Sequence, residues 1–176
     1  YKITMRLYPF LLLTLLCLFG YSQQDVNKRK YHRMYITLSD KLIECDVLKE
    51  DPKIEAKESL SYFWYVTNEV KETKGGYSGK LLDGEYKVFY LNKNLREKGQ
   101  FHNGLKTGEW TSWNANGKIS EVSNWKNGQK SGKYILYNEL GQKMVEADFK
   151  DDLLHGSMIS YQGNKVASKR EYKDGV

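Results

Sequence analysis

A segment of about 24 residues recurs four times in the second half of the chain, and each copy opens with a glycine. The four copies span residues 84–104, 108–128, 132–152 and 156–175. A period of this length is typical of a repeat array, in which one unit cannot bury its apolar side chains alone and must stack on its neighbours. The chain is therefore expected to fold as a row of similar units.

Three columns of large side chains run through the copies. The first lies two residues after the opening glycine, the second five residues after it, and the third three residues before the closing turn. Their members are Tyr86, Trp110, Tyr134 and Met158 in the first, Phe89, Trp113, Tyr137 and Tyr161 in the second, and Phe101, Trp125, Phe149 and Tyr172 in the third. These columns are the best candidates for the core of the array.

Each unit has the pattern of a β-hairpin. Asn116-Gly117 in the middle and Asn127-Gly128 at the end supply the positive φ angles that tight turns require. In a regular strand Trp110 and Trp113 would point to opposite faces, whereas a bulge would bring them to the same face, and both arrangements stay open. The sequence predicts an all-β fold, an elongated single-layer antiparallel β-meander of stacked 24-residue β-hairpin repeats.

Three further segments precede these copies. Residues 60–79 match the columns without the opening glycine, so we expect a degenerate first unit of an array that spans residues 60–176. Residues 31–49 alternate imperfectly about a short turn, so residues 23–59 are expected to cap the array.

Residues 1–22 have the pattern of a secretory signal peptide. An apolar run at residues 10–20 follows Arg6, is too short to span a bilayer, and precedes a cleavage site predicted after Ser22. A lipoprotein anchor at Cys17 is less favoured because Leu16, which is not small, precedes it. We expect an exported protein that is periplasmic, associated with the outer membrane, or secreted.

The charge pattern and the lack of reactive motifs narrow the function. The formal net charge is +6, and the two signs are interleaved along the repeats, which is not the clustered footprint of a nucleic-acid binder. Weak attraction to an anionic membrane surface remains open. The three histidines lie far apart, and no nucleophile elbow or phosphate-binding loop occurs. We expect no catalytic residues, no metal site and no cofactor.

The aromatic columns allow two interpretations. As a binding surface, the rings would stack on sugars or cage a quaternary amine. As a core, the same rings would pack one hairpin on the next, and this interpretation is favoured. The candidate surface residues are Tyr86, Trp110, Trp113, Tyr134, Tyr137 and Tyr161. An aromatic face left uncovered would be an apolar patch of the kind that marks partner binding.

These units resemble the MORN repeat, in particular its variant form in bacteria. The matching residues are openings such as Gly108-Glu109-Trp110-Thr111-Ser112-Trp113 and closings such as Trp125-Lys126-Asn127-Gly128. The resemblance implies protein–protein association, or attachment to membranes and phospholipids. Bacterial variant-repeat proteins are also described as antitoxins of the YwqK type, which would make the chain an antitoxin or immunity protein.

The expected function is a non-catalytic, exported scaffold that binds another protein. The alternatives are a membrane-surface module, a glycan- or choline-binding protein, and an antitoxin. The last strand leaves an edge with no evident cap, so a homodimer formed through that C-terminal edge is a further expectation.

Overall fold

The computed structural model describes residues 30–163 and 165–176, so the predicted signal peptide lies outside the described part. All regular secondary structure in the described residues is β. The strands are β1 (Tyr31–Thr37), β2 (Leu42–Leu48), β3 (Ser61–Val66), β4 (Glu69–Lys74), β5 (Lys80–Phe89), β6 (Leu95–His102), β7 (Leu105–Trp113), β8 (Ile119–Lys126), β9 (Gln129–Tyr137), β10 (Lys143–Lys150), β11 (Leu153–Gln162) and β12 (Lys165–Tyr172). Within the described part of the chain, no helix has the length and apolarity to cross a membrane.

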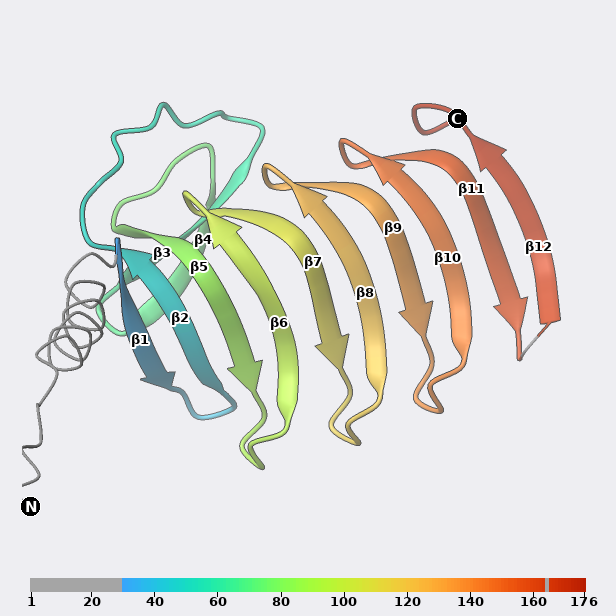
Figure 1. Cartoon of the computed structure of the whole chain (residues 1–176), viewed down its shortest axis with the longest axis horizontal. Coiled ribbons are helices and arrows are strands. Elements are labelled where there is room, and N and C mark those ends of the chain that lie inside the picture. The colour runs from blue at the N-terminus through green and yellow to red at the C-terminus, as the bar shows by residue number, and fades with distance from the viewer. Residues whose placement is uncertain (1–29, 164) are drawn as a thin grey trace, which may run out of the picture. The chain divides into compact units, whose positions relative to one another are not determined.

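The strands form one open antiparallel sheet (Figure 1). Ten of them follow the order β1-β2-β5-β6-β7-β8-β9-β10-β11-β12, and from β5 onward each strand pairs with the next one in the chain. The predicted all-β fold with an antiparallel hairpin meander is therefore confirmed.

Each repeat is a hairpin whose turns follow the predicted chemistry. Asn103-Gly104 joins β6 to β7 with φ angles of 49° and 77°, and Asn127-Gly128 joins β8 to β9 with 50° and 82°. Two consecutive positive φ angles define the type I′ turn, whose twist matches that of the flanking strands. Asp151-Asp152 adopts the same geometry without glycine, with φ angles of 51° and 69°.

Each turn between two hairpins also bonds to the first strand of the hairpin before it. The amide of Gly104 donates to the carbonyl of Leu82 at 2.7 Å, and the amide of Gly128 donates to the carbonyl of Lys106 at 2.9 Å. The amide of Asp152 donates to Lys130 in the same way, also at 2.9 Å. These turn amides are thus satisfied only when the strand two places back in the sheet is present, which favours folding as a continuous array.

A column of small side chains separates the large ones on one face of the sheet. Gly99 lies between Tyr86 and Trp110, and a Cβ atom added to Gly99 would overlap the indole of Trp110. Ser123 lies between Trp110 and Tyr134, and Ala147 lies between Tyr134 and Met158. Large and small residues therefore alternate across the strands, so that each ring packs over the small side chain of its neighbours.

The first two columns of large residues point to opposite faces. Trp110 and Trp113 both lie in β7, and the extra residue at the register shift beside them belongs to β8. Since β7 itself has no bulge between them, the strand alternation sends the two indoles to opposite sides. The face that carries Trp110 is called here the Trp110 face, and the other is called the Trp113 face.

The segment 60–79 forms a hairpin that does not continue the row of repeats. Strands β3 and β4 lie off the main strand order, and only Trp64 and Tyr65 of β3 pair with the start of β5. The hairpin crosses the Trp110 face, with Phe63 packed on Phe101 at 4.8 Å between ring centroids. The place beside β5 that a first repeat was expected to occupy is taken by β2 instead. The expected single layer is consequently doubled at this end of the sheet.

The core lies where the hairpin covers the sheet. One cluster of buried residues joins β1, β2, β5, β6 and β7, and a second packs the outer side of the hairpin against Leu48 and Leu81. Cys45 is buried beside Tyr86, and burial raises the pKa of its thiol to about 12. The N-terminal part of the array is therefore a two-layer structure that supports the later repeats.

Candidate interaction surface

Two lysines lie among the aromatic rings of the Trp110 face. Lys106 Nζ is 3.9 Å from the ring centroid of Trp110 and 5.1 Å from that of Trp125. Lys130 Nζ is 4.8 Å from the ring of Tyr134, 5.7 Å from that of Trp125 and 5.8 Å from that of Phe149. Cation–π attraction holds the ammonium groups there, while the aliphatic stems lie over apolar surface.

These five residues form what is called here the open face: Lys106, Trp125, Lys130, Tyr134 and Phe149. They come from β7, β8, β9 and β10, and all five are half-buried. In the first two repeats the equivalent rings are buried, with Phe101 and Trp110 each 3% exposed. The cause of this difference is the β3–β4 hairpin, which pairs with the start of β5 and packs Phe63 on Phe101 of β6 and beside Lys106 of β7.

The two lysines differ in their charge partners. Lys106 Nζ lies 3.3 Å from Glu97 Oε1, so its charge is balanced within the sheet. Among the described residues, no carboxylate lies within salt-bridge distance of Lys130 Nζ. The Tyr134 hydroxyl donates a hydrogen bond to Glu121 Oε2 at 3.4 Å. Burial, with a contribution from the Glu121 carboxylate, raises the pKa of that hydroxyl. The open face therefore carries a cation that is paired only with rings.

A hollow of about 310 Å³ lies where the covering hairpin meets the open face. The hairpin side contributes Phe63 and Glu72, and the sheet side contributes Lys106, Trp125 and Gly128. The hollow thus has an aromatic wall, a backbone turn and charges of both signs. Such a combination suits recognition of a side chain together with its backbone.

The six candidate residues predicted from the sequence lie in three different places: the core, the open face and the Trp113 face. Tyr86 and Trp110 are core residues, with ring centroids 5.7 Å apart and exposures of 8% and 3%, in agreement with the favoured core interpretation and not with the alternative of a binding surface. The cause of their burial is the covering hairpin. Tyr134 lies on the open face. The other three, Trp113, Tyr137 and Tyr161, are half-buried in strands whose alternation places them on the Trp113 face.

The arrangement also bears on the hypothesis of an aromatic cage for a quaternary amine. The three rings best placed to form such a cage are those of Trp125, Tyr134 and Phe149, and the protein's own Lys130 already lies among them. A cationic ligand would have to displace Lys130, which disfavours choline as the ligand of this face.

The columns used for prediction missed most of the open face. Trp125 and Phe149 belong to the third aromatic column, which was assigned to the core and not to the surface. Lys106 and Lys130 stand 24 residues apart, each two residues before an opening glycine, and that regular spacing was the available signal.

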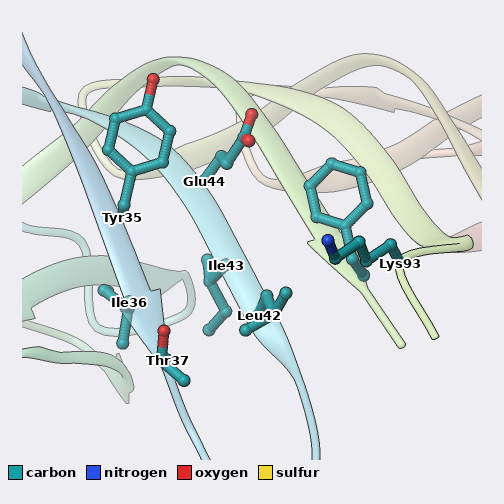
Figure 2. Close-up of a pocket in the computed structure, with 8 residues that line it drawn as sticks. Tyr35, Ile36, Thr37, Leu42, Ile43, Glu44 and Lys93 are labelled. Atoms are coloured by element: carbon teal, nitrogen blue, oxygen red, sulfur yellow. The ribbon is translucent and has the colours of Figure 1, made fainter. Parts of the chain in front are cut away.

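A second hollow, of about 280 Å³, lies near the turn that joins β1 to β2 (Figure 2). It is lined by Tyr35, Leu42, Glu44, Phe89 and Lys93, among others, and Tyr35 is 69% exposed. Figure 2 shows Tyr35 and Glu44 projecting to the same side of β1 and β2. This hollow combines the exposed ring of Tyr35 with Phe89 and with Lys93 from the turn between β5 and β6.

A comparison with known protein families finds a match for two of the repeats. The model of the MORN repeat variant matches residues 82–103 and 106–127, which are the hairpins β5–β6 and β7–β8. These two hairpins are MORN repeat variants. The hairpins β9–β10 and β11–β12 continue the same meander, with the same turn-to-strand hydrogen bonds. No curated protein matches the chain significantly.

MORN repeats are generally interaction modules, which is consistent with a repeat protein that binds proteins or membranes. The match covers the variant repeat as such and does not identify the YwqK type. Among the described residues, no group of three or more histidine, cysteine, aspartate or glutamate side chains is arranged to hold a metal ion.

Proposed function

We propose that this protein is an exported, non-catalytic scaffold that binds another protein through the open face. The observation that carries the proposal is the change in cover along one continuous sheet. The same aromatic columns are buried in the first repeats, where β3–β4 packs on them, and half-buried from Trp125 onward. An apolar face of this kind, bordered by charged residues, is typical of a site for a macromolecular partner.

The position of the lysines favours a protein over a membrane as the partner. A membrane-surface module attracts anionic headgroups with ammonium groups that project toward them. Here Lys106 is held over Trp110 and beside Glu97, and Lys130 lies among three rings. Both charges are thus drawn into the protein surface, where they assist a close, desolvated contact more than a screened, long-range one.

Export is the second part of the proposal, and its support is the sequence of residues 1–22. If these residues are a signal peptide, the exported protein begins at Gln23. N-terminal sequencing of the protein recovered from the cell envelope tests this directly. Recovery of an N-terminus that retains the apolar run would contradict cleavage at that place.

Binding is tested by affinity capture with purified residues 23–176 from detergent-solubilised envelope, with mass-spectrometric readout. We expect one protein near one-to-one stoichiometry that is retained at high salt, because the contact is largely apolar. Capture should be lost with Trp125→Ala and kept with Tyr35→Ala, which alters the hollow of Figure 2. A partner that is a toxin would assign an immunity role. Recovery of no protein, together with flotation of the purified protein on anionic liposomes, would contradict the scaffold proposal.

A further inference from the structure

The chain contains an internal example of a ligand bound to its own repeats. The β3–β4 hairpin docks on the Trp110 face through Phe63, whose amide donates to the carbonyl of Gly104 at 2.8 Å. The ring of Phe63 lies 4.8 Å from that of Phe101, and Lys106 Nζ is 5.6 Å from its centroid. One repeat thus recognises an aromatic residue with a turn carbonyl, a ring and an ammonium group.

The next repeat presents the same three groups without an occupant from the described chain. Gly128, Trp125 and Lys130 stand 24 residues after Gly104, Phe101 and Lys106, respectively. The backbone is equivalent as well, since the two turn glycines have similar φ angles and make the same hydrogen bond to the first strand of the hairpin before the turn. Gly128 and Trp125 both line the hollow beside the hairpin.

The internal ligand also carries a carboxylate near its aromatic ring. Glu72 lies directly opposite Phe63 in the β3–β4 hairpin, and it lines the hollow together with Lys106. One repeat further, Lys130 has rings around it and no carboxylate within salt-bridge distance among the described residues. A ligand that copies Phe63 and Glu72 would supply the missing anion.

We propose that the second site binds an extended segment of a partner protein in which an aromatic side chain stands beside a carboxylate. The aromatic ring would pack on Trp125 in the hollow, its backbone amide would meet the carbonyl of Gly128, and the carboxylate would meet Lys130. The inference rests on the proposed function, since it names the partner's chemistry at the open face. It assigns the β3–β4 hairpin the role of a template for that partner.

The test uses the hairpin itself as the probe. A head-to-tail cyclic peptide of residues 61–74 is titrated into the purified protein by isothermal calorimetry. We expect one site on the wild type, about tenfold weaker binding to Lys130→Glu, and unchanged binding to Lys150→Glu. Lys150 is the matched control because it is an exposed lysine of β10 that undergoes the same charge change.

Two peptide variants separate the ring from the carboxylate. Phe63→Ala in the peptide should abolish measurable binding, and Glu72→Gln should weaken it about threefold to tenfold. Should Lys130→Glu fail to fold, Lys130→Met keeps the aliphatic stem over the rings. On Lys130→Met the Glu72→Gln peptide should bind as well as the parent peptide, because the charge pair is already broken.

Three results would overturn the inference: no binding of the peptide at millimolar concentration, equal binding to wild type and Lys130→Glu, or loss of binding with Lys150→Glu as well. Equal binding would mean that the peptide merely exchanges with the hairpin at its own site. If Lys130 matters only for flotation on phosphatidylglycerol vesicles, the face belongs to a membrane. A native partner captured equally by wild type and Lys130→Glu would leave the scaffold function intact and refute only this site.

Discussion

The covered and the uncovered parts of the Trp110 face are built from the same columns and differ in what lies over them. Beneath the β3–β4 hairpin, Leu82 is fully buried between the first repeats. At the equivalent positions of the next two repeats, Lys106 and Lys130 take its place and lie across the rings. At this position the side chain is apolar in the first repeat, where the β3–β4 hairpin packs on the face. In the next two repeats it is a lysine, whose long aliphatic stem shields the rings. Packing of the β3–β4 hairpin, and not the repeat itself, therefore decides whether a ring belongs to the core or to the surface.

The largest effect expected from this comparison concerns two phenylalanines of one column. Phe101→Ala removes a ring that is 3% exposed and should lower the free energy of unfolding by about 3–5 kcal/mol. Phe149→Ala removes a half-buried ring two repeats later and should cost about 1–2 kcal/mol, since less apolar area is returned to water.

Urea unfolding of the two variants followed by circular dichroism measures both costs. Since repeat arrays can unfold in steps, the transition is also followed by tryptophan fluorescence. Equal costs for the two variants would show that the two regions are not differently covered.

The next largest effect is expected in the column of small residues against which the rings pack. Gly99→Ser places a side chain against the indole of Trp110 and should cost about 1–3 kcal/mol. The following repeat pairs Ser123 with the smaller ring of Tyr134 across β8 and β9. The double variant Gly99→Ser, Trp110→Tyr copies that pair and should recover part of the loss, whereas additive costs in urea unfolding would contradict the packing account.

The smallest effect lies at alkaline pH. Burial raises the pKa of the Tyr86 and Tyr134 hydroxyls, so the folded state holds both protons more firmly than the unfolded chain does. The stabilisation is fully present below the unfolded value of about 10 and is lost as pH rises through the folded pKa.

Tyr86→Phe should therefore flatten the alkaline loss of stability above pH 10, and Tyr134→Phe should flatten it less, because Tyr134 is only half-buried. Thermal unfolding midpoints measured across the alkaline range give this comparison. A larger change for Tyr134→Phe than for Tyr86→Phe would reverse the assignment of covered and uncovered rings.

Local signals were sufficient to predict the hairpins. The period, the Asn-Gly turns and the strand alternation place the hairpins from β5 to β12 in the array, because each of these features depends on neighbouring residues. Even Trp110 and Trp113 obey simple alternation, because the register shift at Trp113 adds its extra residue to β8 and not to β7.

The site was harder to predict because its cover comes from elsewhere in the chain. Residues 60–79 carry the same columns as a repeat, yet their hairpin turns across the sheet and β2 takes the place next to β5. No local pattern distinguishes a hairpin that extends a sheet from one that lies on it. For Tyr86 and Trp110 the core was therefore the favoured prediction and a binding surface the alternative, while Trp125 and Phe149 were assigned to the core alone.

The most direct test of the account is hydroxyl-radical footprinting of the purified protein, read residue by residue by mass spectrometry. The account predicts that Trp125, Tyr134 and Phe149 are modified several times faster than Trp110, Tyr86 and Phe101, their counterparts in the same columns. It further predicts that a bound partner protects only the first three. Similar rates in the two sets would contradict the claim that the β3–β4 hairpin divides one aromatic face into a core and a binding surface.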